Sequence, residues 1–270
     1  MTEPQNRSEM RELLTRHGLA PRKPLGQHFL ADPNIVRRIV RLSGVTVGSQ
    51  VLEVGAGTGT LTRALAATGA RVIAYEVDES LSPLLDETVG ELPNVEVRID
   101  DAANLDAGEL TGEWTLVANL PYNVGTPILL DLLRTAPAIR HFVVMVQREM
   151  ADRLTAEPGS KTYGLPTVVI DLFAKARFAF SVPPQVFVPP PQVSSAVVEI
   201  SRQETVPEEA ALALELASAG FSQRRKMLRS SLRSVSEDPS QLCSEAGVDP
   251  SRRAESLTSA EWLALARAAK

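Results

Sequence analysis

Up to about residue 203, short apolar runs alternate with amphipathic segments. The apolar runs predict buried strands at residues 50–54, 71–75, 95–99, 114–118 and 142–146, followed by a strand pair at 176–182 and 195–201. Helical spacing of apolar residues marks the segments 33–40, 61–67, 79–89, 126–133, 148–154 and 165–173. Alternating strands and helices predict an α/β fold with a mainly parallel sheet and helices on both faces.

The pattern changes at both ends of this region. A short helix from Ser8 to His17 and two proline breaks define a basic N-terminal arm, residues 1–24. Beyond residue 203 the spacing becomes wholly helical, with segments at 208–219, 222–232, 239–246 and 259–268. We therefore predict an arm (1–24), a sheet domain (25–203) and a small all-helical C-terminal domain (204–270).

Several polar residues follow predicted strands directly. Glu53 and Gly55 end the first strand, and Glu76, Asp101 and Asn119 follow the next three. In an open α/β sheet, ligands bind at the carboxyl ends of the strands, so these residues are candidates for one ligand site. Alone, Asp101 is equally well explained as the cap of a turn or helix.

A glycine loop, residues 55–59, lies between the first strand and a helix, which is the context of a nucleotide-binding motif. Glu76 follows about 20 residues later, where an acid can accept from ribose hydroxyls. The same motif is also typical of a dehydrogenase that binds a dinucleotide. However, the spacing is Gly-x-Gly-x-Gly, and Glu53 precedes the loop directly. That arrangement favours S-adenosylmethionine, a cofactor that has no phosphate to place at the helix N-terminus.

The tetrapeptide Asn119-Leu120-Pro121-Tyr122 can bind a flat base that carries an amine. The Asn119 side chain and the Leu120 carbonyl would accept the amine's hydrogens, and Tyr122 would stack on the ring. Phe187, next to a run of prolines, is predicted to clamp the base from the other face. Read alone, the tetrapeptide could be a turn that leaves a strand, and Phe187 could belong to the core.

Net charge is −5 and the pI is about 5.4, which argues weakly against a nucleic-acid partner. The charge is uneven, however, and phosphates respond to the local field. Candidate RNA-binding residues are Arg22 and Lys23 in the arm, and Arg224, Arg225, Lys226 and Arg229 in the tail. We predict the tail group on helix 222–232, without acidic partners and with Met227, Leu228 and Leu232 as its buried stripe. A solvated helix face is the alternative explanation.

Other classes of site are disfavoured. One cysteine excludes an intramolecular disulfide framework, and three scattered histidines predict no metal site. No segment resembles a signal peptide or a membrane span, so we expect a cytoplasmic protein without a membrane partner.

Five motifs occur in the order seen in ribosomal RNA adenine dimethyltransferases, and the chain resembles that family from about Lys23 to Leu232. They are Gln27-His28-Phe29-Leu30, Val51-Leu52-Glu53-Val54-Gly55-Ala56-Gly57-Thr58-Gly59-Thr60-Leu61-Thr62, Asn119-Leu120-Pro121-Tyr122, Phe187-Val188-Pro189-Pro190-Pro191-Gln192-Val193-Ser194-Ser195 and Phe221-Ser222-Gln223-Arg224-Arg225-Lys226. The resemblance implies a Rossmann-like methyltransferase fold with a seven-stranded sheet. It also implies S-adenosylmethionine as cofactor and S-adenosylhomocysteine as product.

Carried over by position, the resemblance implies cofactor contacts at His28, Leu30, Gly55, Gly57, Glu76, Asp101 and Asn119. His28 stands where many members have asparagine, and Ala56 where proline is common. The chain looks closest to the small-subunit branch, which dimethylates two adjacent adenosines near the end of 16S rRNA. That branch implies the immature 30S subunit as partner during ribosome biogenesis, and we expect a monomer.

Two alternatives remain open within this resemblance. The sister branch methylates 23S rRNA and confers macrolide resistance. The chain could also be chiefly a 30S assembly factor whose methylation is incidental. A small-molecule methyltransferase is disfavoured by the basic arm, the basic tail and the base-gripping tetrapeptide together.

Overall fold

The computed structural model describes residues 4–270 and divides into two compact units. The first combines the chain up to Ala151 with Arg177–Ser201, and the second combines Asp152–Ala176 with Arg202–Lys270. The arm therefore groups with the sheet. Residues 152–176, which the hydrophobic pattern assigned to the sheet domain, group with the helical C-terminal residues.

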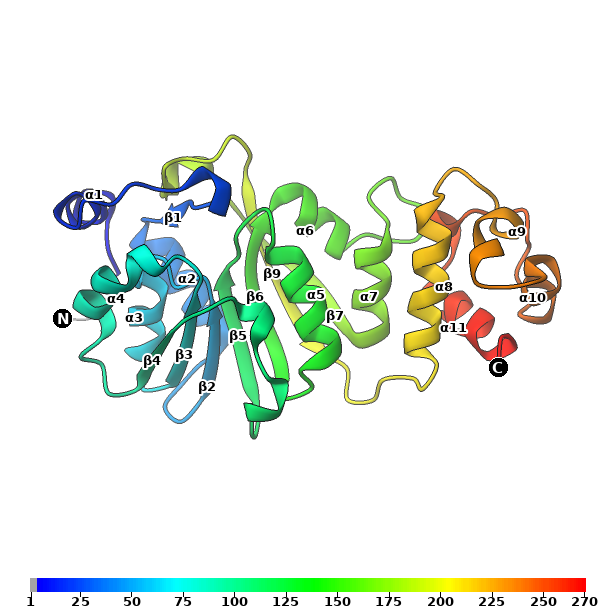
Figure 1. Ribbon diagram of the computed structural model, residues 1–270, viewed down its shortest axis with the longest axis horizontal. Coiled ribbons are helices and arrows are strands. Elements are labelled where there is room, and N and C mark those ends of the chain that lie inside the picture. Colours follow the sequence, from blue (N-terminus) through cyan, green and yellow to red (C-terminus); the bar gives the residue numbers. More distant parts are fainter. Residues whose placement is uncertain (1–3) are drawn as a thin grey trace. The chain divides into compact units, whose positions relative to one another are not determined.

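A seven-stranded sheet forms the centre of the first unit, with the order β4-β3-β2-β5-β6-β9-β7 (Figure 1). The strands are β2 (Gln50–Val54), β3 (Arg71–Glu76), β4 (Val95–Ile99), β5 (Trp114–Asn119), β6 (Ile139–Gln147), β7 (Ala174–Val182) and β9 (Ser195–Arg202). Strands β2 to β6 pair in parallel, and β9 is antiparallel to β6. The predicted mainly parallel sheet is confirmed.

Helices lie on both faces of this sheet. In Figure 1, α5 (Gly125–Thr135) lies in front, and α2 (Pro33–Ser43) and α3 (Thr60–Ala66) lie behind. The Asp32 side chain caps α2, because it accepts from the backbone N–H groups of Asn34 and Ile35. Helix α4 (Ser82–Val89) also belongs to this unit, and α6 (Arg148–Leu154) begins in it and ends in the second unit. Short 3-10 turns occur at Lys23–Leu25, Glu79–Leu81, Ala102–Asn104, Ala107–Glu109 and Pro184–Val186.

A second, two-stranded sheet joins segments that are far apart in the sequence. Strand β1 (Phe29–Leu30) pairs antiparallel with β8 (Phe187–Val188), with Leu30 opposite Phe187. Helix α1 (Arg7–Arg16) packs beside it through buried Met10, Leu13 and Leu14. The hydrophobic pattern assigned no strand to the Phe187 segment. It is a strand because its backbone finds a partner in β1.

The second unit is helical. Its elements are α7 (Leu165–Phe173), α8 (Ala210–Ser222), α9 (Leu228–Ser231), α10 (Pro239–Glu245) and α11 (Ser259–Ala268), with 3-10 turns at Leu232–Ser234 and Ala254–Ser256. The predicted helix 222–232 is wrong: α8 ends at Ser222, and a turn precedes α9. Leu228 and Leu232 are buried, but Met227 is exposed. Within residues 4–270, no helix combines the length and the apolar character needed to cross a membrane.

Candidate active site

A cavity of about 240 Å³ opens at the carboxyl ends of the parallel strands. Most of the site residues predicted from the sequence line it: His28, Gly55, Glu76, Asp101, Asn119, Leu120, Pro121 and Tyr122. Leu30, Gly57 and Phe187 do not. Residues from four strand ends and from the loop before β1 therefore meet in one place, as the geometry of a parallel sheet requires.

Glu76 is held in a fixed position at the end of β3. Its two carboxylate oxygens accept from the backbone N–H groups of Gly57 at 2.8 Å and of Asp78 at 3.0 Å. Burial raises the pKa of this carboxyl, and the two backbone hydrogen bonds oppose that shift. Each oxygen keeps a lone pair that can accept a ligand hydroxyl. Gly57 thus acts on the cavity through Glu76 rather than by lining it.

The loop that carries Gly57 requires glycine for two reasons. Gly57 has φ +57°, and a side chain there would meet the Phe29 ring at 3.0 Å. At Gly59, with φ +76°, a Cβ atom would come within 2.7 Å of Thr88 Oγ1 on α4. The loop is therefore packed between β1 and α4. Just before it, burial raises the pKa of Glu53 to about 8, so this carboxyl is protonated at neutral pH.

Asp101 caps a turn and also lines the cavity. One oxygen accepts from the backbone N–H of Ala103 at 2.9 Å and caps the short 3-10 turn Ala102–Asn104. Its side chain is exposed and lines the cavity. Because a carboxylate has two oxygens, the cap leaves the second one able to accept from a ligand amine.

The Asn119 amide has a defined orientation. Its Nδ2 donates to the backbone carbonyl of His28 at 3.0 Å. Because the nitrogen is used in this way, the side-chain oxygen is the acceptor that Asn119 can offer to the cavity. Leu120 is buried, and its backbone N–H donates to the Met145 carbonyl at 3.1 Å, which aligns the peptide that follows.

Tyr122 and His28 form a stacked aromatic pair in the site. Their rings stack with centroids 5.3 Å apart and an interplanar angle of 28°. The Tyr122 hydroxyl bonds with Ser195 Oγ at 2.5 Å, and burial raises the pKa of this phenol. His28 Nδ1 lies 2.8 Å from the Pro189 carbonyl, and because a carbonyl only accepts, Nδ1 carries the proton.

The loop before β1 forms one wall of the cavity through contacts that sequence analysis did not assign. Gln27 Nε2 donates to Asp78 at 2.8 Å, and Arg22 pairs with the other oxygen of the same carboxylate at 3.0 Å. The Asn123 side chain donates to the Pro24 carbonyl at 2.9 Å. The sequence draws attention to Gln27 by its motif and to Asp78 by its position two residues after Glu76. The two residues are 51 positions apart, so no local pattern predicts that their side chains bind each other.

Phe187 differs from its predicted role. Its side chain is fully buried in the core beneath β8 and does not reach the cavity. The pairing of β8 with β1 turns this ring inward. The aromatic residues that line the cavity are His28, Phe29, Tyr75 and Tyr122.

The tail cations fall into two groups. Arg224 pairs with Glu255 at 2.9 Å and donates to the carbonyls of Lys161 and Tyr163. The expected absence of acidic partners is therefore wrong for this residue. Arg225, Lys226 and Arg229 are exposed, as is Lys23 in the arm.

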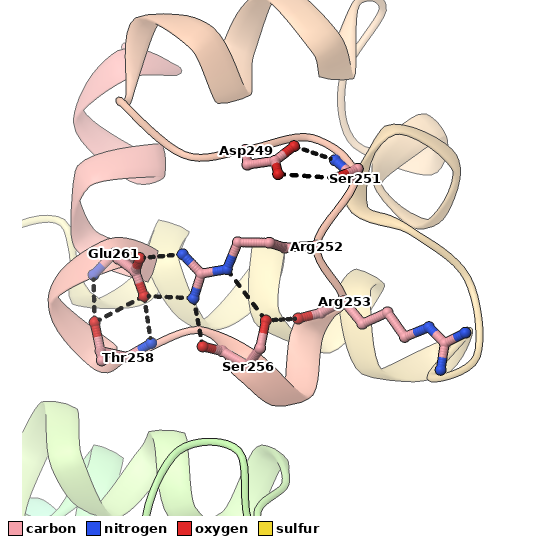
Figure 2. Close-up of polar contacts among 7 residues, drawn as sticks. All are labelled: Asp249, Ser251, Arg252, Arg253, Ser256, Thr258 and Glu261. Atoms are coloured by element: carbon pink, nitrogen blue, oxygen red, sulfur yellow. Dashed lines mark hydrogen bonds and ion pairs between the residues drawn. The ribbon is translucent and has the colours of Figure 1, made fainter.

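The turn that carries these cations is hydrogen-bonded to the segment 250–252. Leu228 N–H donates to the Arg252 carbonyl and Arg229 N–H to the Pro250 carbonyl. Figure 2 shows the side-chain contacts of this segment: Arg252 binds Glu261 and Ser256, and Glu261 also caps α11 with Thr258. The Arg253 side chain extends away from these contacts, whereas its carbonyl accepts from Ser256 Oγ (Figure 2).

The cavity fits S-adenosylmethionine on its own chemistry. A fixed acid at Glu76 suits ribose hydroxyls, and the second oxygen of Asp101 suits an adenine amine. Exposed apolar side chains at Val77 and Val124 can cover the faces of an adenine ring. The opposite end of the cavity offers the acceptors of Asn119 and Leu120 to a second molecule.

The sequence is similar to one protein family and to relatives that share one name. The family described as ribosomal RNA adenine dimethylase matches residues 18–270. Ribosomal RNA small subunit methyltransferase A from Phenylobacterium zucineum is 46% identical over 263 residues, covering 96% of this chain and 92% of that protein. The protein of the same name from Bifidobacterium longum is 42% identical over 285 residues, covering 97% and 92%.

Two solved structures of RNA-modifying enzymes have a fold similar to that of this chain. A dimethyladenosine transferase from Plasmodium falciparum has a TM-score of 0.70 and 25% identity, covering 88% of this chain and 96% of that one. The 23S rRNA methyltransferase ErmE has a TM-score of 0.64 and 26% identity, covering 89% and 98%.

Proposed function

We propose that this chain, which belongs to the ribosomal RNA adenine dimethylase family, dimethylates two adjacent adenosines near the 3′ end of 16S rRNA in the immature 30S subunit. It is a methyltransferase that depends on S-adenosylmethionine, in agreement with the family and the fold. The small-subunit target is supported by relatives with 42–46% identity that share more than nine tenths of their length with the chain. We further propose that it acts in the cytoplasm as a monomer.

The observation that carries this proposal is the fixed Asn119 amide. An adenine amine is a poor nucleophile because its lone pair is delocalised into the ring. The Asn119 side-chain oxygen and the Leu120 carbonyl would hold the two amine hydrogens and localise that lone pair. Since Asn119 Nδ2 is already bound to the His28 carbonyl, the acceptor is oriented before the substrate arrives, and no reorganisation of this group is needed during the reaction.

The other site residues would hold the two reactants in line. Glu76, Asp101 and Gly55 would bind the cofactor, with Gly57 acting through Glu76, and His28 and Leu30 would shape that end of the site. When bound, the cofactor supplies an electrophilic methyl group on a sulfonium. Tyr122 would stack on the target adenine, and Pro121 sets the turn that presents it. No strong base is required, because the methylated ammonium product is very acidic.

Phe187 keeps a supporting part in this proposal. Its buried ring fixes β8, and β8 leads directly to Pro189, whose carbonyl orients His28. For RNA binding, the exposed tail cations Arg225, Lys226 and Arg229, and Lys23 in the arm, are the residues that can contact phosphate. Arg22 and Arg224 would remain paired with Asp78 and Glu255, and would add to the positive electrostatic potential that attracts phosphate.

The test uses 30S particles from a strain that lacks the modification, with labelled cofactor. Wild-type protein should give dimethyladenosine, and Asn119→Ala should lower kcat by about 10²- to 10³-fold, the usual effect of removing an oriented electrostatic group. Asn34→Ala, at an exposed asparagine on α2, is the matched control. Absence of any transfer to intact 30S particles by folded wild-type protein contradicts the proposal.

The same assay separates the alternatives. The similarity to ErmE makes a 23S target the second candidate, and transfer to naked 23S RNA but not to 30S particles would select it. If Asn119→Ala protein restored subunit assembly in a null strain, assembly itself would be the main function.

A further inference from the structure

Gln5 is a buried amide at the start of the arm, and both ends of its side chain are bound to the glycine loop region. Its Nε2 donates to the Thr58 carbonyl at 3.2 Å, and its Oε1 accepts from Thr60 Oγ1 at 2.7 Å. The residue is 5% exposed, and Thr58 and Thr60 are buried as well. A buried polar group is costly unless it is satisfied, so this pair of bonds is a specific connection.

The connection reaches the cavity in one further step. Thr58 follows Gly57, whose N–H donates to Glu76. Gln5 therefore holds one side of the Gly57–Thr58 segment while the cofactor acid is bound on the other. Helix α3 has no side-chain cap at its N-terminus, where Gly59 stands at φ +76°. Gly59 has no side chain that could bind the first turn of α3. Gln5 supplies side-chain hydrogen bonds to the residues on either side of Gly59.

A second connection leaves the same arm for the other wall of the site. Arg7 Nη2 donates to the Phe187 carbonyl at 3.0 Å. Phe187 lies in β8, and the Pro189 carbonyl that follows orients His28 against Tyr122. Arg7 thus acts on the region proposed to receive the adenine, whereas Gln5 acts on the region that binds the cofactor.

Helix α1 is held by contacts at its start, along its buried face and at its end. Asn6 and Glu9 form a capping box at its start. Its apolar face is buried, and at its end Arg16 and His17 both pair with Glu87 of α4. The next residue, Thr88, is the one that packs against Gly59.

We propose that helix α1, together with Gln5 just before it, is a brace between the two halves of the active site. Gln5 is a positioning residue for cofactor binding, and Arg7 is a positioning residue for the adenine side. The proposal rests on the methyltransferase activity but not on the identity of the RNA. Neither residue touches a reactant. The arm therefore serves the site as structure, in addition to any contact of its cations with RNA.

The test is titration of the full-length protein with S-adenosylmethionine by calorimetry. Gln5→Ala should raise the Kd about tenfold and raise the KM for the cofactor, while kcat at saturating cofactor stays within about twofold. Arg7→Ala should leave the cofactor Kd unchanged and raise the KM for the RNA that the wild-type protein methylates, whether in 30S particles or as naked 23S RNA. Glu12→Ala, exposed on α1, is the control that should change neither. Amide exchange should increase at residues 55–60 in Gln5→Ala only.

Gln5→Met, which keeps the length but loses both polar atoms, gives the same answer if the alanine variant unfolds. A folded Gln5 variant whose cofactor Kd lies within twofold of wild type overturns the proposal, as does an equal weakening with Glu12→Ala. Failure of transfer to 30S particles would count against the proposed RNA target alone, because the calorimetric readout contains no RNA.

Discussion

At the scale of single residues, the site depends on groups whose hydrogen bonds are partly used by the protein itself. Asn119 gives its nitrogen to the His28 carbonyl, and Glu76 gives one lone pair of each oxygen to the backbone. In both cases the remaining acceptor points in a fixed direction. A residue prepared in this way loses little freedom when its ligand binds.

Glu76→Gln should weaken cofactor binding by about 10- to 100-fold, because an amide replaces a charge-assisted acceptor. The amide nitrogen would also face either the Gly57 or the Asp78 N–H. Calorimetric titration with the cofactor measures the effect. Glu79→Gln, three residues further along the chain, is a control of equal charge change. Equal affinity of Glu76→Gln and wild type would remove Glu76 from the site.

Glu53 should make stability depend on pH. Its folded pKa of about 8 lies above the ordinary value of 4.5, so between these values the folded state holds a proton that the unfolded state has lost. The free energy of unfolding should therefore fall as pH rises through this window, with a slope of up to about 1.4 kcal/mol per pH unit. Denaturant unfolding at pH 5.5, 7 and 8.5 measures it. The slope should shrink in Glu53→Gln, and an unchanged slope would contradict the assignment.

At the scale of elements, the glycine loop is determined by what packs around it. Its backbone passes between the Phe29 ring of β1 and Thr88 of α4, and both approaches leave no room for a side chain. Strand, loop and helix are thus locked together with β1 and with α4. The loop holds its shape because its neighbours require it, and Gln5 adds a polar contact from the arm.

Gly57→Ala should destabilise the protein more than Gly44→Ala does. Both glycines have similar positive φ, +57° and +64°, which costs an alanine about 1–2 kcal/mol. Only at Gly57 does the new methyl group also meet an aromatic ring, at 3.0 Å; Gly44 has nothing within 4 Å. Chemical denaturation of the two variants isolates the packing contribution. Equal destabilisation would mean that Phe29 yields without cost.

At the scale of the whole molecule, each unit is made from two separate stretches of chain. Helix α7 packs against α8 and α11, which follow it by many residues. Its buried side chains include Val168, Val169, Ile170 and Leu172. The helical unit therefore needs residues on both sides of the segment that holds β8 and most of β7 and β9.

A chain truncated after Gln203 should associate or bind hydrophobic dyes, although the cut lies where the hydrophobic pattern changes. The truncation removes α8 and α11 and exposes the apolar face of α7. Size-exclusion chromatography and dye fluorescence measure the outcome. A monomeric truncated chain with cooperative unfolding would show that residues 152–176 belong with the sheet.

The exposed tail cations should control the salt dependence of RNA binding. Replacing Arg225 and Lys226 by glutamine should reduce the slope of log K against log salt by about 2, because each cation that neutralises a phosphate adds about 1 to that slope. Filter binding to 30S particles over a salt series measures the slope. Arg267→Gln on α11, which also removes one positive charge, is the control and should leave the slope unchanged. An unchanged slope in the Arg225/Lys226 double variant would mean that these two residues do not contact RNA phosphates.

Much of the first unit followed from the sequence because its signals are local. Apolar runs locate β2 to β6, Asp32 and Pro33 mark the start of α2, and the carboxyl ends of parallel strands must meet at one edge. Those rules were enough to bring Gly55, Glu76, Asp101 and Asn119 together as one candidate site. Each of these rules uses only residues that are close together in the sequence, combined with the topology of a parallel sheet.

Only the tertiary structure decided the features that depend on a distant partner. Phe187 turned out to be buried because β8 pairs with β1, and Arg224 proved to be engaged because Glu255 lies beside it. The predicted helix 222–232 breaks because Leu228 donates to the Arg252 carbonyl instead of continuing a helical ladder. Gln5 showed no signal at all in the sequence. Periodicity and capping report what a segment does with its own neighbours, whereas the choice of a remote partner is settled only when the whole chain packs.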